Sequence, residues 1–419
     1  MSVPVSESSA RRRAPALDIA VVGGGMVGAA TALVLARAGF STALLEAHAP
    51  TPWSTDAEVD LRVVGLAPSS VVLLGELGVW PSIRAARVGP YTHMHVWDAE
   101  SGAAIDFDAA SEGRDRLGYI VENNLVQWML WQQLQAAGGS SNPSGRSTGT
   151  ALGGVRCLCP AVVTGFEARE DRIQLQLADG GLLSASLLVA ADGASSPLRQ
   201  LAGIGTQGRD YAQRAVVAHL STELPHQHTA WQRFLHRGPL ALLPLADGRS
   251  SLVWSLPEAE AQRVLALDEQ AFAGEVGVAS DFRLGRITAV SARAGFPLRL
   301  KLADRYQAER MVLLGDAAHA VHPLAGQGVN LGLRDVVELR DTLLAARMAG
   351  RDIGASHVLR RYARRRRSAD TLDALGFDAL ARVYALQSPA LVAARGLGMH
   401  LLDKFAPLKR RLSDHAAGR

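Results

Sequence analysis

A glycine-rich turn near the start of the chain constrains the fold more than any other feature. Gly23, Gly25 and Gly28 form a GxGxxG pattern between an apolar run at 18–22 and a helical run that ends near Gly39. The first glycine permits a tight turn, the second lets the backbone approach a pyrophosphate, and the third lets helix and strand pack closely. The N-terminus of the helix then offers free N–H groups to phosphates. The pattern predicts a βαβ unit that binds a dinucleotide.

An acidic residue completes this unit. A second apolar run, Thr42–Leu45, ends at Glu46, whose carboxylate can accept hydrogen bonds from ribose hydroxyls. The same stretch could be taken for a signal peptide or membrane span, because three arginines precede an apolar run from 19 to 36. A strand, a turn and a helix explain these residues and Glu46 together, so we expect no membrane span. The unit alone does not distinguish FAD from NAD.

The bulk composition limits the class of protein. A chain of 419 residues is too long for one compact core, which predicts two closely packed domains. The formal net charge is only +4, which gives no case for binding nucleic acid. Two cysteines cannot build a disulfide framework, which favours a cytoplasmic location. Neither Cys157 nor Cys159 has a histidine or further cysteine near it in sequence, so we expect no metal site there.

Two later segments repeat the arrangement of an apolar strand followed by an acid. Leu187–Ala191 leads into Asp192 and Gly193, where an acid that only shapes the turn is an equally good explanation. Met311–Leu314 leads into Asp316, which could accept a hydrogen bond from a ribityl hydroxyl. The turn at 326–328 then opens a long helical pattern and would present N–H donors to the edge of a ring.

Together these segments resemble a known family. The stretches GGGMVG, ADGASSPLR and GDAAHAVHPLAGQGVNLG resemble the class A flavin-dependent aromatic hydroxylases, the group of para-hydroxybenzoate hydroxylase. LGYIVENN at 117–124 and GPLALLPL at 238–245 resemble its ubiquinone-biosynthesis branch, and among these the enzymes that act on a demethoxyubiquinol-type ring. The likeness runs from about residue 16 to the C-terminus.

The resemblance implies FAD as the cofactor and NAD(P)H as the electron donor. No second GxGxxG unit with an acid follows, so the donor is expected to lack a Rossmann site of its own. Matched position by position, the FAD contacts implied are Gly23, Gly25, Gly28, Glu46, Arg62, Gln127, Asp192, Gly193, Asp316, Pro323, Gly326, Gln327, Gly328, Val329 and Asn330.

The expected fold is α/β, with a Rossmann-like FAD-binding domain interleaved with a β-sheet substrate domain and a helical C-terminal region. A disordered tail is expected at 1–14. The FAD-binding domain would comprise 15–82, 116–205 and 305–345, the substrate domain 83–115 and 206–304, and the helical region 346–419. Alternation of apolar and polar residues at 173–177 indicates a strand.

The implied activity is hydroxylation of an aromatic ring with O2, by way of a flavin C4a-hydroperoxide. The substrate would be a polyprenylated phenol or quinol of ubiquinone biosynthesis. No catalytic base can be assigned, and His319 and His322 are expected to pack against the flavin turn, because no carboxylate partner for them is evident. Candidate pocket residues are bulky side chains of the substrate domain, each also explicable as core: Trp231, Phe234, Leu240, Leu243 and Trp254.

Two alternatives stay open: another flavoenzyme on the same scaffold, such as an epoxidase or prenyl reductase, or a subunit that keeps FAD without catalysis.

The C-terminal region has a composition that bears on binding partners. Arginines crowd 360–367, and an apolar-rich run from 375 to 405 is followed by three more basic residues. The simpler interpretation is a solvated helix face. The other is docking to anionic lipid at the inner membrane, or to a biosynthetic complex or a second copy.

Overall fold

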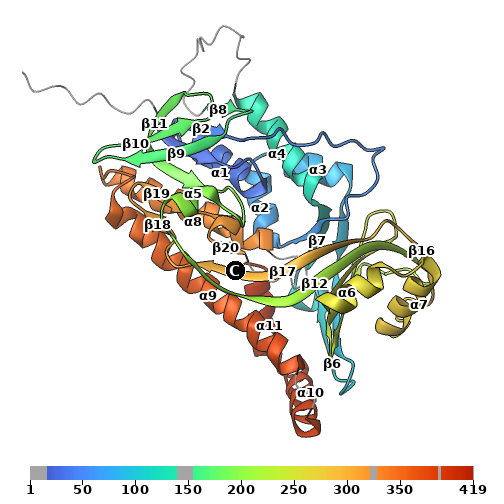
Figure 1. Ribbon diagram of the computed structural model, residues 1–419. Coiled ribbons are helices and arrows are strands. Elements are labelled where there is room, and N and C mark those ends of the chain that lie inside the picture. Colours follow the sequence, from blue (N-terminus) through green and yellow to red (C-terminus); the bar gives the residue numbers. More distant parts are fainter. Residues whose placement is uncertain (1–16, 139–153, 321–327, 386–387, 419) are drawn as a thin grey trace, which may run out of the picture.

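The computed structural model describes residues 17–138, 154–320, 328–385 and 388–418. The tail expected at 1–14 therefore lies outside the described residues. Figure 1 shows two sheets, one carrying helices α1, α4 and α8 and the other carrying α6 and α7. A long helix, α9 (Ser356–Ala385), runs along the side of both.

The glycine turn lies at the carboxyl ends of a mostly parallel sheet of eight strands. Its central strand β1 (Leu17–Val22) pairs in parallel with β2 (Thr42–Leu45) on one side and β11 (Leu182–Ala190) on the other. Both faces of β1 are covered, which explains its almost continuous apolar sequence. The other strands are β8 (Val155–Leu158), β9 (Val163–Ala168), β10 (Ile173–Leu177), β18 (Gln307–Ala308) and β19 (Met311–Leu313).

Small and branched apolar residues let the helices pack closely on this sheet. Helix α1 (Met26–Arg37) lies against α4 (Asn123–Ala137) and α8 (Gly328–Met348), and all three contribute to the largest apolar core. A three-stranded sheet lies beside them. This sheet has the order β3 (Val63–Leu66), β7 (Gly118–Glu122) and β4 (Gly89–Tyr91). The remaining helices of this part are α2 (Pro68–Glu76), α3 (Trp80–Ala86) and α5 (Pro197–Leu201).

The second sheet has nine strands and joins segments that are far apart in the chain. β5 (His93–Asp98) pairs in parallel with β13 (Thr229–Leu235), so residues from 83–115 and 206–304 form one sheet. The strand β12 (Thr206–Thr222) is 17 residues long. The other strands are β6 (Ala104–Asp108), β14 (Gly238–Pro244), β15 (Ser250–Pro257), β16 (Ile287–Val290), β17 (Ala294–Ala303) and β20 (His319–Ala320).

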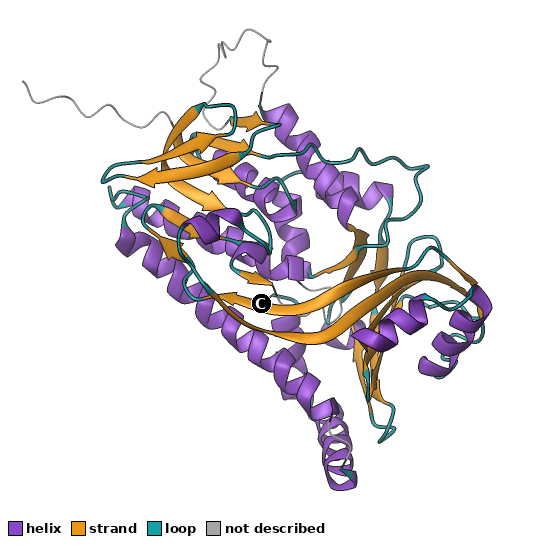
Figure 2. Ribbon diagram, viewed as in Figure 1, coloured by secondary structure: helices purple, strands orange, loops and turns teal. Residues whose placement is uncertain are grey.

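The two faces of the second sheet have different neighbours. Helices α6 (Glu258–Leu265) and α7 (Glu269–Ala279) cover one face, where Val216, Trp254 and Phe272 belong to a separate apolar core. Figure 2 shows these helices on the side away from the first sheet. Because side chains alternate along a strand, the residues next to these core positions point toward the first sheet.

The C-terminal region is helical, as α9, α10 (Pro389–Lys404) and α11 (Ala406–Ala416). The expectation of a solvated basic face on α9 needs correcting at one position. Arg360, Arg364 and Arg367 are exposed, but Arg366 is only 7% exposed and points into the first sheet's domain. Among the described residues, none of the helices has the length and apolar character needed to cross a membrane.

Candidate functional site

A cleft of about 650 Å³ lies between the carboxyl ends of the first sheet and one face of the second. Its floor is made by the glycine turn, by the residues after β11 and β19, and by the start of α8. The opposite wall comes from β12, β15 and β17. The segments that the sequence linked to the flavin therefore meet at one place.

The glycine turn depends on the absence of side chains at two positions and is open at the third. Gly23 has a φ of +105°, and a Cβ there would lie 2.3 Å from the carbonyl oxygen of Ala191. A Cβ on Gly28 would lie 1.9 Å from the carbonyl oxygen of Gly23. A Cβ on Gly25 would meet nothing within 4 Å, because Gly25 faces the cleft. Gly25 is also the N-cap of α1 and supplies no capping side chain, so the first N–H groups of the helix are left for an anion.

Three side chains hold the residue between these glycines. Glu46 accepts hydrogen bonds from the backbone N–H groups of Gly24 and His48. Gln127 donates to the carbonyl oxygen of Gly24 at 3.0 Å, and the indole of Trp131 donates to the same oxygen at 2.7 Å. Gln127 also lines the cleft. Trp131 was missed by the sequence analysis, because a tryptophan in an amphipathic helix carries no signal beyond burial.

The acid of the second motif is used within its own turn. Asp192 accepts from the hydroxyl of Ser196 at 2.5 Å and from the backbone N–H of Leu198 at 3.1 Å, which fixes the start of α5. Asp192 does not line the cleft, whereas Gly193 and Ser195 do. Of the two interpretations left open, this geometry supports an acid that shapes the turn.

A buried arginine joins the second and third motifs. Arg199 is 5% exposed and donates to the carbonyl oxygen of Ala194 at 3.0 Å and to that of Ala317 at 2.8 Å. These carbonyls belong to the turns after β11 and β19, both part of the cleft floor, so Arg199 sets the distance between these two turns. The sequence placed Arg199 in the second motif but gave no indication of its partner on the third.

The third motif brings a carboxylate to the cleft. Asp316 lies in the 3₁₀ turn Gly315–Ala317 and lines the cleft. Asp316 is exposed to the open cleft, and the surrounding protein atoms, which displace water from its carboxyl group, raise its pKa, an effect that the nearby His319 partly opposes. The backbone N–H of Gly315 donates to Asp335 of α8 at 2.8 Å, which anchors this turn to the helix behind it.

The start of α8 divides between cleft and interior. Gly328 and Val329 line the cleft. Asn330 is 3% exposed and points away from it, donating to the carbonyl oxygen of Gly65 at 2.7 Å and accepting from the N–H of Ala67 at 3.0 Å. Asn330 thus links α8 to the segment between β3 and α2. The predicted contacts Pro323, Gly326 and Gln327, and also His322, lie outside the described residues. Arg62 lines the cleft from the opposite side.

The wall on the second sheet is apolar toward its middle and basic toward one end. Ala215, Val217, Val253, Phe296 and Pro297 line it, followed by Arg299 and Lys301. None of the five bulky residues considered from sequence lines this cleft. Leu240 and Trp254 point to the other face, beneath α6 and α7, and Trp231 packs against that core. Leu243 lies in a cluster that includes Val253 and Val63, and Phe234 stacks on Tyr384 at 3.9 Å between ring centroids.

A histidine lies next to this wall. His219 follows Val217 by two residues on β12, so its side chain is on the same face of the sheet. It is 2% exposed, its Nε2 lies 3.1 Å from the carbonyl oxygen of Asp60, and its Nδ1 has no partner among the described residues. Burial lowers the pKa of His219, which keeps the ring neutral at physiological pH. Ser251, directly opposite on β15, also has an unpaired hydroxyl among those residues.

Comparison with known proteins identifies the cofactor. Residues 16–372 match the family model described as "FAD binding domain". The chain is 37% identical over 401 residues to 3-demethoxyubiquinol 3-hydroxylase of Escherichia coli, covering 96% of this chain and 98% of that protein. It is 35% identical to the mitochondrial ubiquinone biosynthesis monooxygenase COQ6 of Xenopus tropicalis, covering 96% and 93%. The chain belongs to the FAD-dependent hydroxylases of the ubiquinone-biosynthesis branch.

A solved structure supports the fold. HpxO of Klebsiella pneumoniae, crystallised with FAD and uric acid, superposes with a TM-score of 0.69 at 19% identity, covering 96% of each chain. The expected fold class and the family recognised from the three motifs are therefore confirmed, as is FAD as the cofactor. The division into domains and the individual contact residues stay predictions.

The residues present fit FAD. Gly25 leaves room where a side chain would block a pyrophosphate, and the start of α1 offers N–H groups without a competing cap. At the other end of the floor, Asp316 and the backbone of Gly328 and Val329 face the same cleft. This combination suits a long ligand with a charged middle and a polar, ring-shaped end.

Proposed function

We propose that this protein hydroxylates the aromatic ring of a polyprenylated phenol or quinol in ubiquinone biosynthesis, with O2 and NAD(P)H as co-substrates. The observation that carries the proposal is the cleft itself, in which flavin-binding turns face an apolar wall made by Val217, Val253 and Phe296. The names of the two relatives point to the same substrate class. When bound, FAD supplies the redox chemistry that activates O2.

The chain's own task is to bind, orient and exclude water. We assign the pyrophosphate to Gly25 and the N-terminus of α1, the ribose to Glu46, and the ribityl chain to Asp316. The backbone of Gly328 and Val329 would take the polar edge of the ring. Val217 and Val253 would pack on the substrate ring, because an apolar wall keeps water away from reactive oxygen species.

We assign the polar end of the substrate pocket to His219 and Ser251. Buried polar atoms without partners are uncommon, and among the described residues two of them lie side by side next to the apolar wall, on the same face of the sheet. A neutral imidazole nitrogen accepts a hydrogen bond, and a phenol hydroxyl is a donor, directly or through one water. His219→Ala should raise KM for the phenol and leave FAD content unchanged.

The activity is tested with purified holoprotein, NAD(P)H and a short-chain prenylated phenol in air. We expect substrate-stimulated oxidation of NAD(P)H and a product heavier by one oxygen atom by mass spectrometry. Val253→Trp should place a bulky side chain in the cleft beside the wall. The variant should retain FAD but form no product. Its control is Val72→Trp, because Val72 is 61% exposed on α2 and does not line the cleft. Reduction of a prenyl double bond or epoxide formation would assign another reaction to the same scaffold, and NAD(P)H oxidation unaffected by every such phenol would refute the hydroxylase assignment.

We further propose that α10 and α11 place the enzyme on an anionic membrane surface. Large apolar side chains three or four residues apart are exposed along these helices and at the junction between them: Leu397, Leu401, Phe405, Leu408 and Leu412. Lys404, Arg410 and Arg411 are exposed beside them. Basic residues near an anionic surface each contribute about 1 kcal/mol, and the apolar stripe adds burial in the interface. A polyprenylated substrate is held in such a membrane.

Vesicle flotation tests this surface. The protein should float with vesicles containing phosphatidylglycerol and much less with phosphatidylcholine alone, and Leu401→Ser with Phe405→Ser should abolish flotation. The control is Leu182→Ser, an exposed leucine on β11. If the double variant instead changes the oligomeric state in size-exclusion chromatography, with no flotation of the parent protein, the stripe is an interface between copies.

A further inference from the structure

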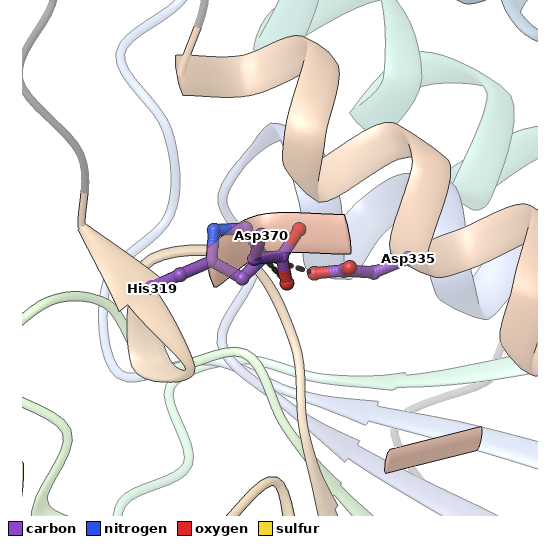
Figure 3. A group of neighbouring side chains, drawn as sticks. All are labelled: His319, Asp335 and Asp370. Atoms are coloured by element: carbon purple, nitrogen blue, oxygen red, sulfur yellow. Dashed lines mark hydrogen bonds and ion pairs between the residues drawn. The ribbon is translucent and has the colours of Figure 1, made fainter. Parts of the chain in front are cut away.

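A group of four charged side chains lies buried behind the cleft floor, and the chemistry proposed above does not use it. It comprises His319 on β20, Asp335 on α8, and Arg366 and Asp370 on α9. Asp335 and Asp370 are fully buried, His319 is 1% exposed and Arg366 is 7% exposed. Figure 3 shows the histidine and the two carboxylates converging from three separate elements.

The group is held together by bonds that also reach the flavin turn. His319 Nε2 lies 2.7 Å from Asp335 Oδ2 and 3.6 Å from Asp370 Oδ2. The guanidinium of Arg366 donates to both carboxylates. Asp335 Oδ2 also accepts the N–H of Gly315, the residue directly before Asp316. The orientation of Asp335 therefore determines where the Asp316 turn lies.

His319, Asp335 and Asp370 together could be mistaken for a metal site, because an imidazole and two carboxylates are common metal ligands. Arg366 already supplies a cation between the two carboxylates. The charges of Asp335 and Asp370 raise the pKa of His319 to about 9, against the lowering effect of burial, so the ring is protonated at neutral pH. Two carboxylates, a guanidinium and an imidazolium sum to zero. A divalent ion would leave a buried excess of positive charge, which the interior does not tolerate.

The contacts from α9 lie on one stripe of the helix. Tyr362, Arg366 and Asp370 are spaced four residues apart and therefore lie above one another on the same face. The hydroxyl of Tyr362 donates to the carbonyl oxygen of Leu313 at 3.0 Å, just before the turn, while Arg366 bonds Asp335 just behind it. The C-terminal helix thus holds the strand that enters the turn and the carboxylate that anchors it.

We propose that Arg366 and Asp370 are positioning residues of the flavin site, which set the geometry of the Asp316 turn through Asp335 and His319. Apolar side chains would attach α9 at lower energetic cost, because buried ion groups seldom add net stability over a packed apolar core. A buried group of hydrogen-bonded charges instead fixes the positions and orientations of its side chains relative to one another. The inference rests on the proposed contact between Asp316 and the flavin.

The test compares two buried arginines of the same domain. Arg366→Gln removes the cation of the group. Arg310→Gln is the matched control, because Arg310 is 4% exposed and bonds Asp352 and the carbonyl oxygen of Ser186, with no bond to the Gly315 turn. For each variant we would measure the Tm of the apoprotein, the Kd for FAD from flavin fluorescence, and the visible spectrum of the bound flavin.

We expect both variants to lower the apoprotein Tm, and Arg366→Gln alone to weaken FAD binding by about tenfold or more and to change the flavin spectrum. Asp370→Asn keeps the shape of the side chain and should weaken FAD binding less, by about threefold, and it decides the matter if Arg366→Gln does not fold. An equal change in Kd for Arg310→Gln and Arg366→Gln, or an unchanged Kd in both Arg366→Gln and Asp370→Asn, would overturn the proposal.

Asp316→Ala separates this inference from the flavin placement on which it rests. If Asp316→Ala weakens FAD binding while Arg366→Gln and Asp370→Asn do not, only the positioning role fails. If none of the three variants changes the Kd for FAD, the contact between Asp316 and the flavin fails, and the positioning role fails with it.

Discussion

The two turns that form the ends of the cleft floor are built in different ways. The Gly23–Gly28 turn is shaped by close approach of backbone to backbone, with no space for Cβ atoms at Gly23 and Gly28. The Gly315–Ala317 turn is shaped by side chains from elsewhere, through Asp335 and the charged group behind it. The first turn requires glycine at two positions, and Glu46, Gln127 and Trp131 hold the residue between them. The second turn is anchored through the carboxylate of Asp335, which belongs to a buried charged group.

This difference predicts which substitutions should disrupt each turn. A change in the first turn acts locally and by steric conflict, whichever residue replaces the glycine. A change in the second can come from α9, about 50 residues further along the chain, without touching the turn. The second turn should therefore respond to titration of the charged group behind it.

The largest effect is expected at the open glycine. Gly25→Val leaves the fold intact, because a Cβ at this position meets nothing, but its side chain occupies the path of the pyrophosphate. We expect FAD affinity to fall by about 100-fold or more at an almost unchanged apoprotein Tm. Retention of FAD by the purified variant, measured as the ratio of flavin to protein absorbance, would contradict the placement.

The link between the turn after β11 and the Gly315–Ala317 turn should come next. Arg199→Met removes a buried cation that donates to one carbonyl in each of two turns. We expect a loss of about 2–4 kcal/mol in the free energy of unfolding of the holoprotein, measured by urea denaturation. Arg169→Met, on an exposed arginine that pairs with Glu167, is the control and should change it by less than about 0.5 kcal/mol. Equal effects would mean that Arg199 does not link the turns.

The pH dependence of the Tm tests the charged group behind the second turn. The pKa of His319 is about 9 in the folded protein, above its ordinary 6.5, with Asp335, Asp370, Arg366 and Tyr306 as its charged and titratable neighbours. A raised pKa stabilises the fold fully below pH 6.5, and this contribution is lost as the pH rises to about 9. The Tm should fall over this window, by the equivalent of up to roughly 3 kcal/mol. His319→Gln should flatten the curve, and identical slopes would argue against a buried imidazolium.

The smallest effect is expected at Gln127. Its amide shares the carbonyl oxygen of Gly24 with the indole of Trp131, which remains in place after substitution. Gln127→Leu should therefore weaken FAD binding by only about threefold to tenfold, and Trp131→Phe by a similar factor. The double variant should exceed the sum of the two single effects in free energy, because the carbonyl then has no side-chain donor.

The sequence allowed the first turn to be predicted almost completely. The glycines directly follow their strand, and Glu46 ends the next strand, so spacing alone predicted that they lie together. The bonds from Gly24 and His48 to Glu46 were not predicted. For the third motif, Asp316, Gly328 and Val329 were predicted as contacts and line the cleft, but the group that anchors the turn was not predicted. Asp335 and Asp370 are ordinary acids in helices, and Arg366 stands in a run of arginines whose other members at 360, 361, 364, 365 and 367 are exposed. Their roles depend on which helix face meets which strand, which no local pattern specifies.

The cleft wall on the second sheet shows that individual pocket residues are also difficult to predict from sequence. The sequence correctly indicated a strand-rich second domain, but the pocket candidates it offered were bulky side chains that could equally belong to the core. Trp254 and Leu240 face the core under α6 and α7, while Val253, one position away, faces the cleft. A shift of one residue moves a side chain to the other face of a strand, so the correct face must be known before a pocket can be assigned.

The helix α9 has a mechanical consequence for the whole molecule. Its 30 residues span about 45 Å at 1.5 Å per residue. Near its start it is fixed to the first domain by Tyr362 and Arg366, and near its end Tyr384 stacks on Phe234 of the second sheet. A helix attached to both domains should limit hinge opening between them, and we expect it to do so here. Substrate and product must pass through openings made by smaller movements, and a long prenyl chain would thread in rather than be enclosed.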